Sequence, residues 1–191
     1  KPIRAPHHFD LSGVLTAVLW SIMFNQHFGV LNDLLAKLGI IKEPIAWLAN
    51  TKFVLGSVIV AELWRGIPFF AISLLAAMQG LPDDIYEAAR VDGSTKFQTF
   101  RFITLPMLKN TIVLTTLLRT IWEFNSVDLI YSLTGGGPVG KTTTLSMLIA
   151  NQAIKTSNYG YGSALSVVSF AILAVIAVIY MKLSGFGKEE A

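Results

Sequence analysis

One segment of the chain has the residue types and spacing of a phosphate-binding loop. Residues 135–142 read GGGPVGKT, which fits the pattern G-x-x-x-x-G-K-[ST]. In such a loop the backbone N–H groups surround the phosphates, Lys141 would contact the terminal phosphate and Thr142 would bind Mg²⁺. That chemistry needs a buried strand before the loop, but a long amphiphilic run precedes it, and no apolar run ending in Asp-Glu follows to hold the metal. A nucleotide-binding protein is therefore kept only as an alternative.

A second set of polar residues lies inside apolar segments. Ionisable side chains at membrane depth cost about 2.5–3.5 kcal/mol each on insertion scales, so they usually face a cavity or a partner. Arg65 and Gly66 form one cluster, and Trp122, Glu123 and Ser126 are the centre of another. In the second cluster the spacings of three and four residues predict that the side chains share roughly one helix face.

These clusters support more than one interpretation. Aromatic rings beside carboxylate and hydroxyl acceptors suit a sugar, because the rings stack on its apolar faces and the oxygens accept from its hydroxyls. A structural ion pair between Arg65 and Glu123 would explain the charges equally well. In a third interpretation, Glu123 and Asp128 are the ion sites of an ion-coupled secondary transporter.

The composition excludes several classes of site. The 191 residues are 53% hydrophobic and 14% charged, which is more hydrophobic than ordinary soluble domains. The absence of cysteine removes disulfides, thiolate metal sites and cysteine nucleophiles. The formal net charge is only +3, and no basic run indicates a nucleic-acid partner. We expect no catalytic residue, no cofactor and no metal site.

The elements that must position the polar residues are apolar helices. A spanning helix needs about 20 mostly apolar residues. Residues 159–181 satisfy this without an acid or base other than tyrosine, residues 53–79 and 111–133 are long enough but carry charges, and residues 11–26 are short. The sequence predicts an all-α, polytopic transmembrane helical bundle with about four spans. Residues 25–32 are expected to form a polar turn.

A charged segment separates two of these runs. Asp83 and Asp84 favour a helix start there, since carboxylates are stabilised at the positive end of a helix dipole. Gly93 suits the left-handed residue that ends a helix. Ser94 or Thr95 could cap a second helix, which is expected to finish before Pro106. The prediction is a helix-Gly-helix hairpin lying on the membrane surface, although a solvated loop joining two helices would fit the spacing as well.

The sequence of this segment, EAARVDGSTKFQTFRFITLP over residues 87–106, resembles the cytoplasmic "EAA" loop of ABC-transporter permeases. The matching positions are Glu87, Ala88, Ala89, Asp92, Gly93, Ile103, Leu105 and Pro106. The TGGGP turn at residues 134–138 resembles a turn found in permeases of the sugar type. The chain is thus similar to a permease of the binding-protein-dependent carbohydrate-uptake family, with a MetI-like core.

The resemblance implies a partial transmembrane permease domain over residues 1–191, lacking N-terminal helices, with residues 81–106 as a cytoplasmic coupling loop. It implies a multi-pass protein of the inner (plasma) membrane. The expected partners are a second permease subunit, a cytoplasmic ABC ATPase dimer that hydrolyses ATP, an extracytoplasmic solute-binding protein, a carbohydrate or polyol substrate and membrane lipid. Lys and Arg residues favour this orientation weakly, with eight on the loop side and five on the other.

The resemblance also implies roles for individual residues. The residues that it implies contact and couple to the ATPase are Glu87, Ala88, Ala89, Asp92, Gly93, Leu105 and Pro106. The substrate pathway of a maltose-type permease maps onto the following residues: Arg65, Gly66, Phe69, Trp122, Glu123 and Ser126. Arg65 and Glu123 depart from that pattern, because a maltose pocket is mainly aromatic and amide.

Overall fold

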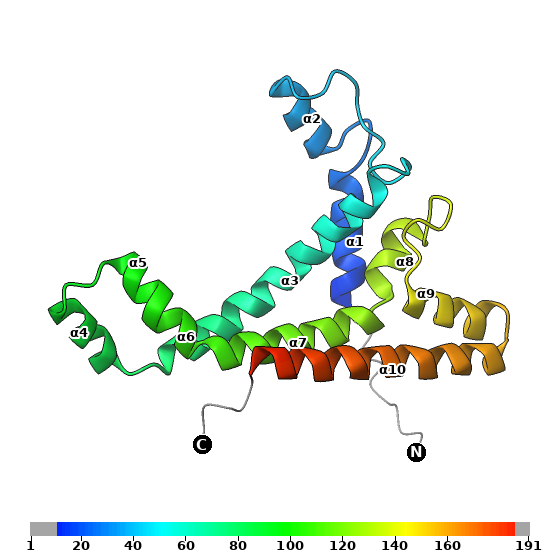
Figure 1. Ribbon diagram of the computed structural model, residues 1–191. Helices are drawn as coiled ribbons and strands as arrows, with labels where there is room; N and C mark the ends of the chain where they lie inside the picture. The colour runs from blue at the N-terminus through cyan, green and yellow to red at the C-terminus, as the bar shows by residue number, and fades with distance from the viewer. Residues whose placement is uncertain (1–10, 186–191) are drawn as a thin grey trace, which may run out of the picture. The chain divides into compact units, whose positions relative to one another are not determined.

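The computed structural model describes residues 11–185, which form helices and turns without any strand (Figure 1). The all-α prediction is confirmed over these residues. The helices and their bounds are α1 (Leu11–Met23), α2 (Val30–Lys37), α3 (Val54–Gln79), α4 (Asp83–Val91), α5 (Lys96–Thr99), η1 (Phe100–Thr104), α6 (Leu105–Met107), α7 (Lys109–Asn125), α8 (Asp128–Thr134), α9 (Leu145–Ala150), η2 (Asn151–Lys155) and α10 (Tyr159–Ser184), where η marks π-helical segments.

Two helices among the described residues are long and apolar enough to cross a membrane. They are α3 and α10, each of 26 residues, and both agree with the spans expected at residues 53–79 and 159–181. Pro68 lies inside α3 without ending it. Helix α1 is apolar but has only 13 residues, and α7 has 17. The total of about four spans therefore stays a prediction.

The expectation of one continuous helix over residues 111–133 is wrong. Helix α7 ends at Asn125 and α8 begins at Asp128. Ser and Asp side chains compete with the backbone for hydrogen bonds, and here the Ser126 hydroxyl donates to the Asp128 carboxylate at 2.7 Å. Ser126 therefore lies beyond the end of α7, and it does not share a helix face with Trp122 and Glu123.

The expected polar turn over residues 25–32 is correct only in its first half. The Asn25 side chain accepts hydrogen bonds from the N–H groups of His27 and Phe28, at 2.9 and 3.2 Å. Helix α2 then begins at Val30 and carries an exposed ion pair between Asp33 and Lys37 four residues apart.

The chain divides into two compact units, each made of two stretches of sequence. Among the described residues, the first contains residues 11–65 and 125–169, and the second contains residues 66–124 and 170–185. In the first unit α1 packs against α8, as Figure 1 shows. Its buried core comprises Ala17, Trp20, Phe24, Val58, Ala61, Leu129, Ile130, Leu133 and Met147.

The Asn32 side chain links α2 to the segment that precedes α3. This side chain is buried, and its amide nitrogen donates to the carbonyls of Gln26 at 3.1 Å and Ile45 at 2.9 Å. Its oxygen accepts from the Ile45 N–H at 3.2 Å and the Trp47 indole at 2.9 Å. All the hydrogen-bonding capacity of the amide is thus used, as a buried polar group requires.

We expect Asn32→Ala to destabilise the full-length protein by at least about 2 kcal/mol. The substitution leaves the Ile45 backbone and the Trp47 indole without partners, at about 1–3 kcal/mol for each buried group. The measurement is the thermal unfolding midpoint in detergent. Asn50→Ala is the matched control, because within residues 11–185 the Asn50 side chain accepts a hydrogen bond only from the Lys52 N–H. Equal midpoints for the two variants would contradict the role of Asn32.

Candidate functional site

The segment expected to be a coupling loop is a helical hairpin. The helix ends on both sides of its turn are capped by hydrogen bonds. Helix α4 ends in a Schellman motif, in which the Ser94 N–H donates to the Ala89 carbonyl at 3.0 Å and the Gly93 N–H to Arg90 at 3.1 Å. Gly93 has φ +74°, as predicted for the left-handed position. These bonds satisfy carbonyls that a helix end otherwise leaves unpaired. The chain direction is therefore fixed at this point.

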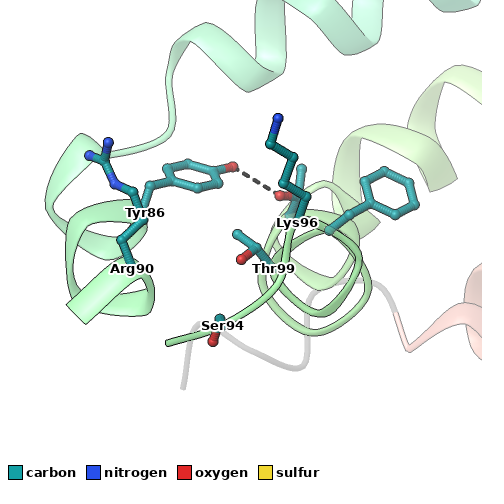
Figure 2. Close-up of a pocket in the computed structure, with 7 residues that line it drawn as sticks. Tyr86, Arg90, Ser94, Lys96 and Thr99 are labelled. Carbon is teal, nitrogen blue, oxygen red and sulfur yellow. Dashed lines mark hydrogen bonds between the residues drawn. The ribbon is translucent and has the colours of Figure 1, made fainter. Parts of the chain in front are cut away.

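The second helix begins with a capping box. The Thr95 hydroxyl accepts from the Gln98 N–H at 3.3 Å, and the Gln98 side chain accepts from the Thr95 N–H at 2.8 Å. Tyr86 reaches from α4 to η1, where its hydroxyl shares a hydrogen bond with the Thr104 hydroxyl at 3.1 Å (Figure 2). The turn of the hairpin is thus fixed by the capping bonds, and this hydrogen bond links α4 to η1.

The second arm differs from the prediction because it does not stop before Pro106. Instead α5 widens into the π-helix η1, in which the Leu105 N–H donates to the Phe100 carbonyl, and α6 continues through Pro106. Proline has no N–H and its ring clashes with the carbonyl four residues earlier, here Phe102. A widened π turn is a common local adjustment to such a conflict. Only the turn at Leu108 then separates this arm from α7.

The residues expected to couple to an ATPase do not all face outward. Glu87, Ala88 and Asp92 are exposed on α4 and its C-terminus. Ala89 is buried, with only 4% of its surface accessible. Glu87 makes an exposed ion pair with Arg90 at 3.5 Å. Leu105 is half-buried, and Pro106 is exposed on α6.

A pocket of about 430 Å³ lies between the arms of the hairpin (Figure 2). Its lining combines two basic side chains, four hydroxyl side chains and one phenyl ring. The bases are Arg90 and Lys96, and the ring is Phe100. The sequence indicated the hairpin but gave no signal for this pocket, because the pocket depends on the angle between the two arms.

Arg65 is the centre of a polar network in the first unit. Its guanidinium pairs with Glu62 at 2.9 Å and with Asp128 at 3.4 Å, and it donates to the Ser126 hydroxyl at 3.1 Å. Only 12% of the Arg65 side chain is exposed. The carboxylates compensate the charge that burial would otherwise penalise. The network joins α3 to the segment where α7 gives way to α8.

Gly13 allows α1 to approach this network closely. A Cβ atom at Gly13 would lie 1.5 Å from the Asp128 carboxylate oxygen and 3.2 Å from the Arg65 guanidinium. Gly13 was absent from the sequence-based list of site residues. A lone glycine in an apolar helix gives no signal until its neighbours are known.

The second unit contains an ion pair on α7 and a contact between two aromatic rings. Arg119 and Glu123 form an ion pair one turn apart on α7, with 17% and 29% of their side chains exposed. A Cβ atom at Gly66 would lie 3.3 Å from the Arg119 guanidinium, so the glycine allows that side chain to pack against α3. Phe69 and Trp122 meet edge to face with ring centroids 5.2 Å apart.

The structure thus distributes the predicted pathway residues between the two units. Arg65 and Ser126 belong to the first, whereas Gly66, Phe69, Trp122 and Glu123 belong to the second. Within each unit the named residues lie close together. Sequence reasoning assigned no role to Arg119 or Glu62, although the spacing of Arg119 four residues before Glu123 was a usable signal for an ion pair.

The loop at residues 135–142 uses backbone N–H groups in hydrogen bonds that close its own turn. It follows helix α8, and the described residues contain no strand that could precede a phosphate-binding loop. The Gly137, Lys141 and Thr142 N–H groups donate to carbonyls within the turn, at 3.0, 3.0 and 3.2 Å. The buried Thr142 hydroxyl bonds to the Thr134 hydroxyl at 2.7 Å and donates to the Gly137 carbonyl at 3.0 Å. These groups therefore do not form a phosphate cradle or a magnesium ligand.

The described residues also contain no group of three or more His, Asp or Glu side chains placed to hold a metal ion.

Comparison with known proteins gives consistent matches. The family described as "Binding-protein-dependent transport system inner membrane component" matches residues 6–185. The trehalose/maltose transport system permease protein MalF of Thermococcus litoralis is 37% identical over 176 residues, which is 92% of this chain and 59% of that protein. The sulfoquinovosyl glycerol transport system permease protein SmoG of Agrobacterium fabrum is 37% identical over 87% of this chain and 53% of its own length.

A solved structure shares the fold. A chain in the crystal structure of a bacterial alginate ABC transporter, in complex with an alginate pentasaccharide-bound periplasmic protein, has a TM-score of 0.79 and 25% identity. The match covers 93% of this chain and 61% of that chain. The present chain therefore spans less than two thirds of the length of these relatives.

Gly13→Ala is expected to destabilise the full-length protein by about 1–3 kcal/mol, the usual cost of overpacking. The added methyl group displaces the Asp128 carboxylate from Arg65. Gly56→Ala is the matched control in α3, because its Cβ would meet nothing within 4 Å and alanine favours helix by up to about 1 kcal/mol. Thermal unfolding in detergent measures both variants. A Gly13 variant as stable as the Gly56 variant would contradict the close contact.

Proposed function

The chain belongs to the family of binding-protein-dependent transport system inner membrane components, and from this we propose that it is a permease subunit of an ABC importer. The proposed substrate is a sugar or a related polyol. Support for this class comes from relatives whose names specify trehalose/maltose, sulfoquinovosyl glycerol and lactose transport. The proposal treats residues 1–191 as part of one membrane domain, in line with the single family match over residues 6–185.

The observation that carries the proposal is the capped hairpin over α4, α5, η1 and α6. Its turn is fixed by the Schellman motif and the capping box, and its arms are joined by the bond between Tyr86 and Thr104. It lies in the same compact unit as α7, from which only the turn at Leu108 separates it. A hairpin held in this way can pass a displacement to α7 instead of absorbing it.

In the proposed mechanism, the hairpin lies in the cytoplasm and binds a separate ATPase subunit. ATP-driven closure of an ATPase dimer displaces the hairpin, and the attached helices move as levers that open the pathway to one side of the membrane and then the other. The chain performs no hydrolysis itself. A second permease subunit forms the other half of the pathway, and an extracytoplasmic solute-binding protein delivers the substrate.

The proposed pathway uses the aromatic and hydroxyl groups described above. Trp122 is half-exposed and its ring meets Phe69 edge to face, which leaves an aromatic surface available for the apolar face of a sugar. The charges of Arg65 and Arg119 are each compensated by carboxylates. They can therefore hold helices together within their own units.

Glu87→Lys is expected to reduce both substrate uptake and substrate-stimulated ATP hydrolysis at least about tenfold, equivalent to about 1.4 kcal/mol. The reason is that a basic side chain would replace the exposed carboxylate proposed to meet a basic group of the ATPase. Both rates are measured in proteoliposomes that contain the complete transporter.

The control for Glu87 is Glu43→Lys, which makes the same charge change at an exposed position outside the hairpin. Membrane insertion should be unaffected in both variants. Wild-type rates of uptake and substrate-stimulated ATP hydrolysis in the Glu87 variant would remove the main support for the proposed function.

Trp122→Ala is expected to lower uptake by about two- to twelvefold, which corresponds to the roughly 0.5–1.5 kcal/mol of an aromatic contact. Trp122→Phe should retain most of the uptake, because it preserves a ring beside Phe69. Uptake is measured together with basal ATP hydrolysis, which neither variant should change. Loss of basal hydrolysis in the alanine variant would indicate a structural role instead.

A further inference from the structure

The pocket between the arms of the hairpin is lined by side chains of only one charge sign. Arg90 and Lys96 supply positive charge, and Ser94 and Thr99 are also in the lining (Figure 2). No carboxylate is among the lining residues. A concave site that contains cations is suited to a group that carries negative charge and accepts hydrogen bonds.

The positive charge of this pocket is not fully compensated within the chain. Lys96 makes no ion pair with any residue between 11 and 185. Arg90 pairs with Glu87 at 3.5 Å, but both side chains are about two-thirds exposed or more, at 73% and 67%. Exposed pairs of this kind contribute about 0–1 kcal/mol, so a better-placed carboxylate could compete with this one.

Exposed apolar side chains elsewhere on the hairpin favour a protein partner over a small ion. Three apolar side chains on the hairpin are strongly exposed: Val91 at 87%, Phe97 at 74% and Phe102 at 71%. Large apolar groups next to charged ones are typical of the surfaces that proteins bury on association. A free anion would cover only the cations and leave these side chains in water.

We propose that the hairpin pocket accepts an acidic side chain of the cytoplasmic ATPase, which inserts between α4 and α5 and pairs with Lys96. This inference rests on the proposed function and extends it, since it assigns a receiving site to this chain. Glu87 on the outer surface of α4 and Lys96 at the pocket then bind groups of opposite charge on the partner. Two contacts of opposite sign fix the register of the interface better than one.

Zero-length crosslinking tests this contact directly. In the complete transporter, a carbodiimide activates a carboxylate, the Lys96 amine attacks the activated carbonyl carbon, an amide bond forms and a urea leaves. Mass spectrometry should identify a peptide in which Lys96 is joined to an Asp or Glu of the ATPase. Lys96→Arg retains the positive charge but has no primary amine, so it should form no such crosslink.

Charge reversal supplies the functional measurement. Lys96→Glu should lower substrate-stimulated ATP hydrolysis about tenfold, whereas Lys42→Glu, at an exposed position outside the hairpin, should leave it unchanged. An intact complex in which Lys96 forms no crosslink to the ATPase and Lys96→Glu couples normally would overturn the pocket proposal. If Glu87→Lys still impairs coupling in that case, only this inference fails. If neither hairpin variant affects coupling, the proposed function fails with it.

Discussion

The structure depends on the compensation of charges placed within apolar helices. Arg65 illustrates the constraint, because it is largely buried in α3 and pairs with Glu62 on its own helix and with Asp128 at the start of α8. Removing one partner of a buried pair is far more costly than the net gain from forming it, typically about 3–5 kcal/mol. The helix break at Ser126, the close approach of Gly13 and the position of α8 are all consistent with this requirement. Each of them brings a polar group to the guanidinium or makes room for one.

The hairpin must meet a different constraint, which is to hold two short helices in a fixed geometry. A short helix is marginal in water, and two short helices joined by a tight turn would not keep a fixed geometry through helix propensity alone. Here the Schellman bonds at Gly93, the capping box of Thr95 and the link between Tyr86 and Thr104 determine the turn and the angle between the arms. The pocket that contains Lys96 is a consequence of this angle. Geometry that is fixed in the absence of a partner lowers the entropy lost when a partner binds.

Local signals in the sequence were sufficient for some of these features. The left-handed conformation at Gly93 and a cap at Ser94 or Thr95 depend on nearby residues, and the structure uses Thr95. The apolar lengths of α3 and α10 are read directly from the sequence. The break between α7 and α8 could not be predicted in the same way, because it depends on Arg65, some sixty positions away in the chain, as well as on Ser126 and Asp128. The π-helical segment before Pro106 was missed because proline permits either an end or a widened turn. Which of the two occurs depends on the packing of the second arm.

The glycine-rich loop shows why a motif needs its structural context. The spacing in residues 135–142 fits a phosphate-binding loop, but a phosphate site needs backbone N–H groups that point together into an open concavity. In this chain the N–H groups of Gly137, Lys141 and Thr142 point at carbonyls of the same turn, and the Thr142 hydroxyl is buried between Thr134 and Gly137. Glycine allows either arrangement because it adopts positive φ at little cost, as Gly135 and Gly136 do here. The preceding element decides between them. A helix ending in a left-handed glycine turns the chain back on itself, and the donors are then used to close the turn.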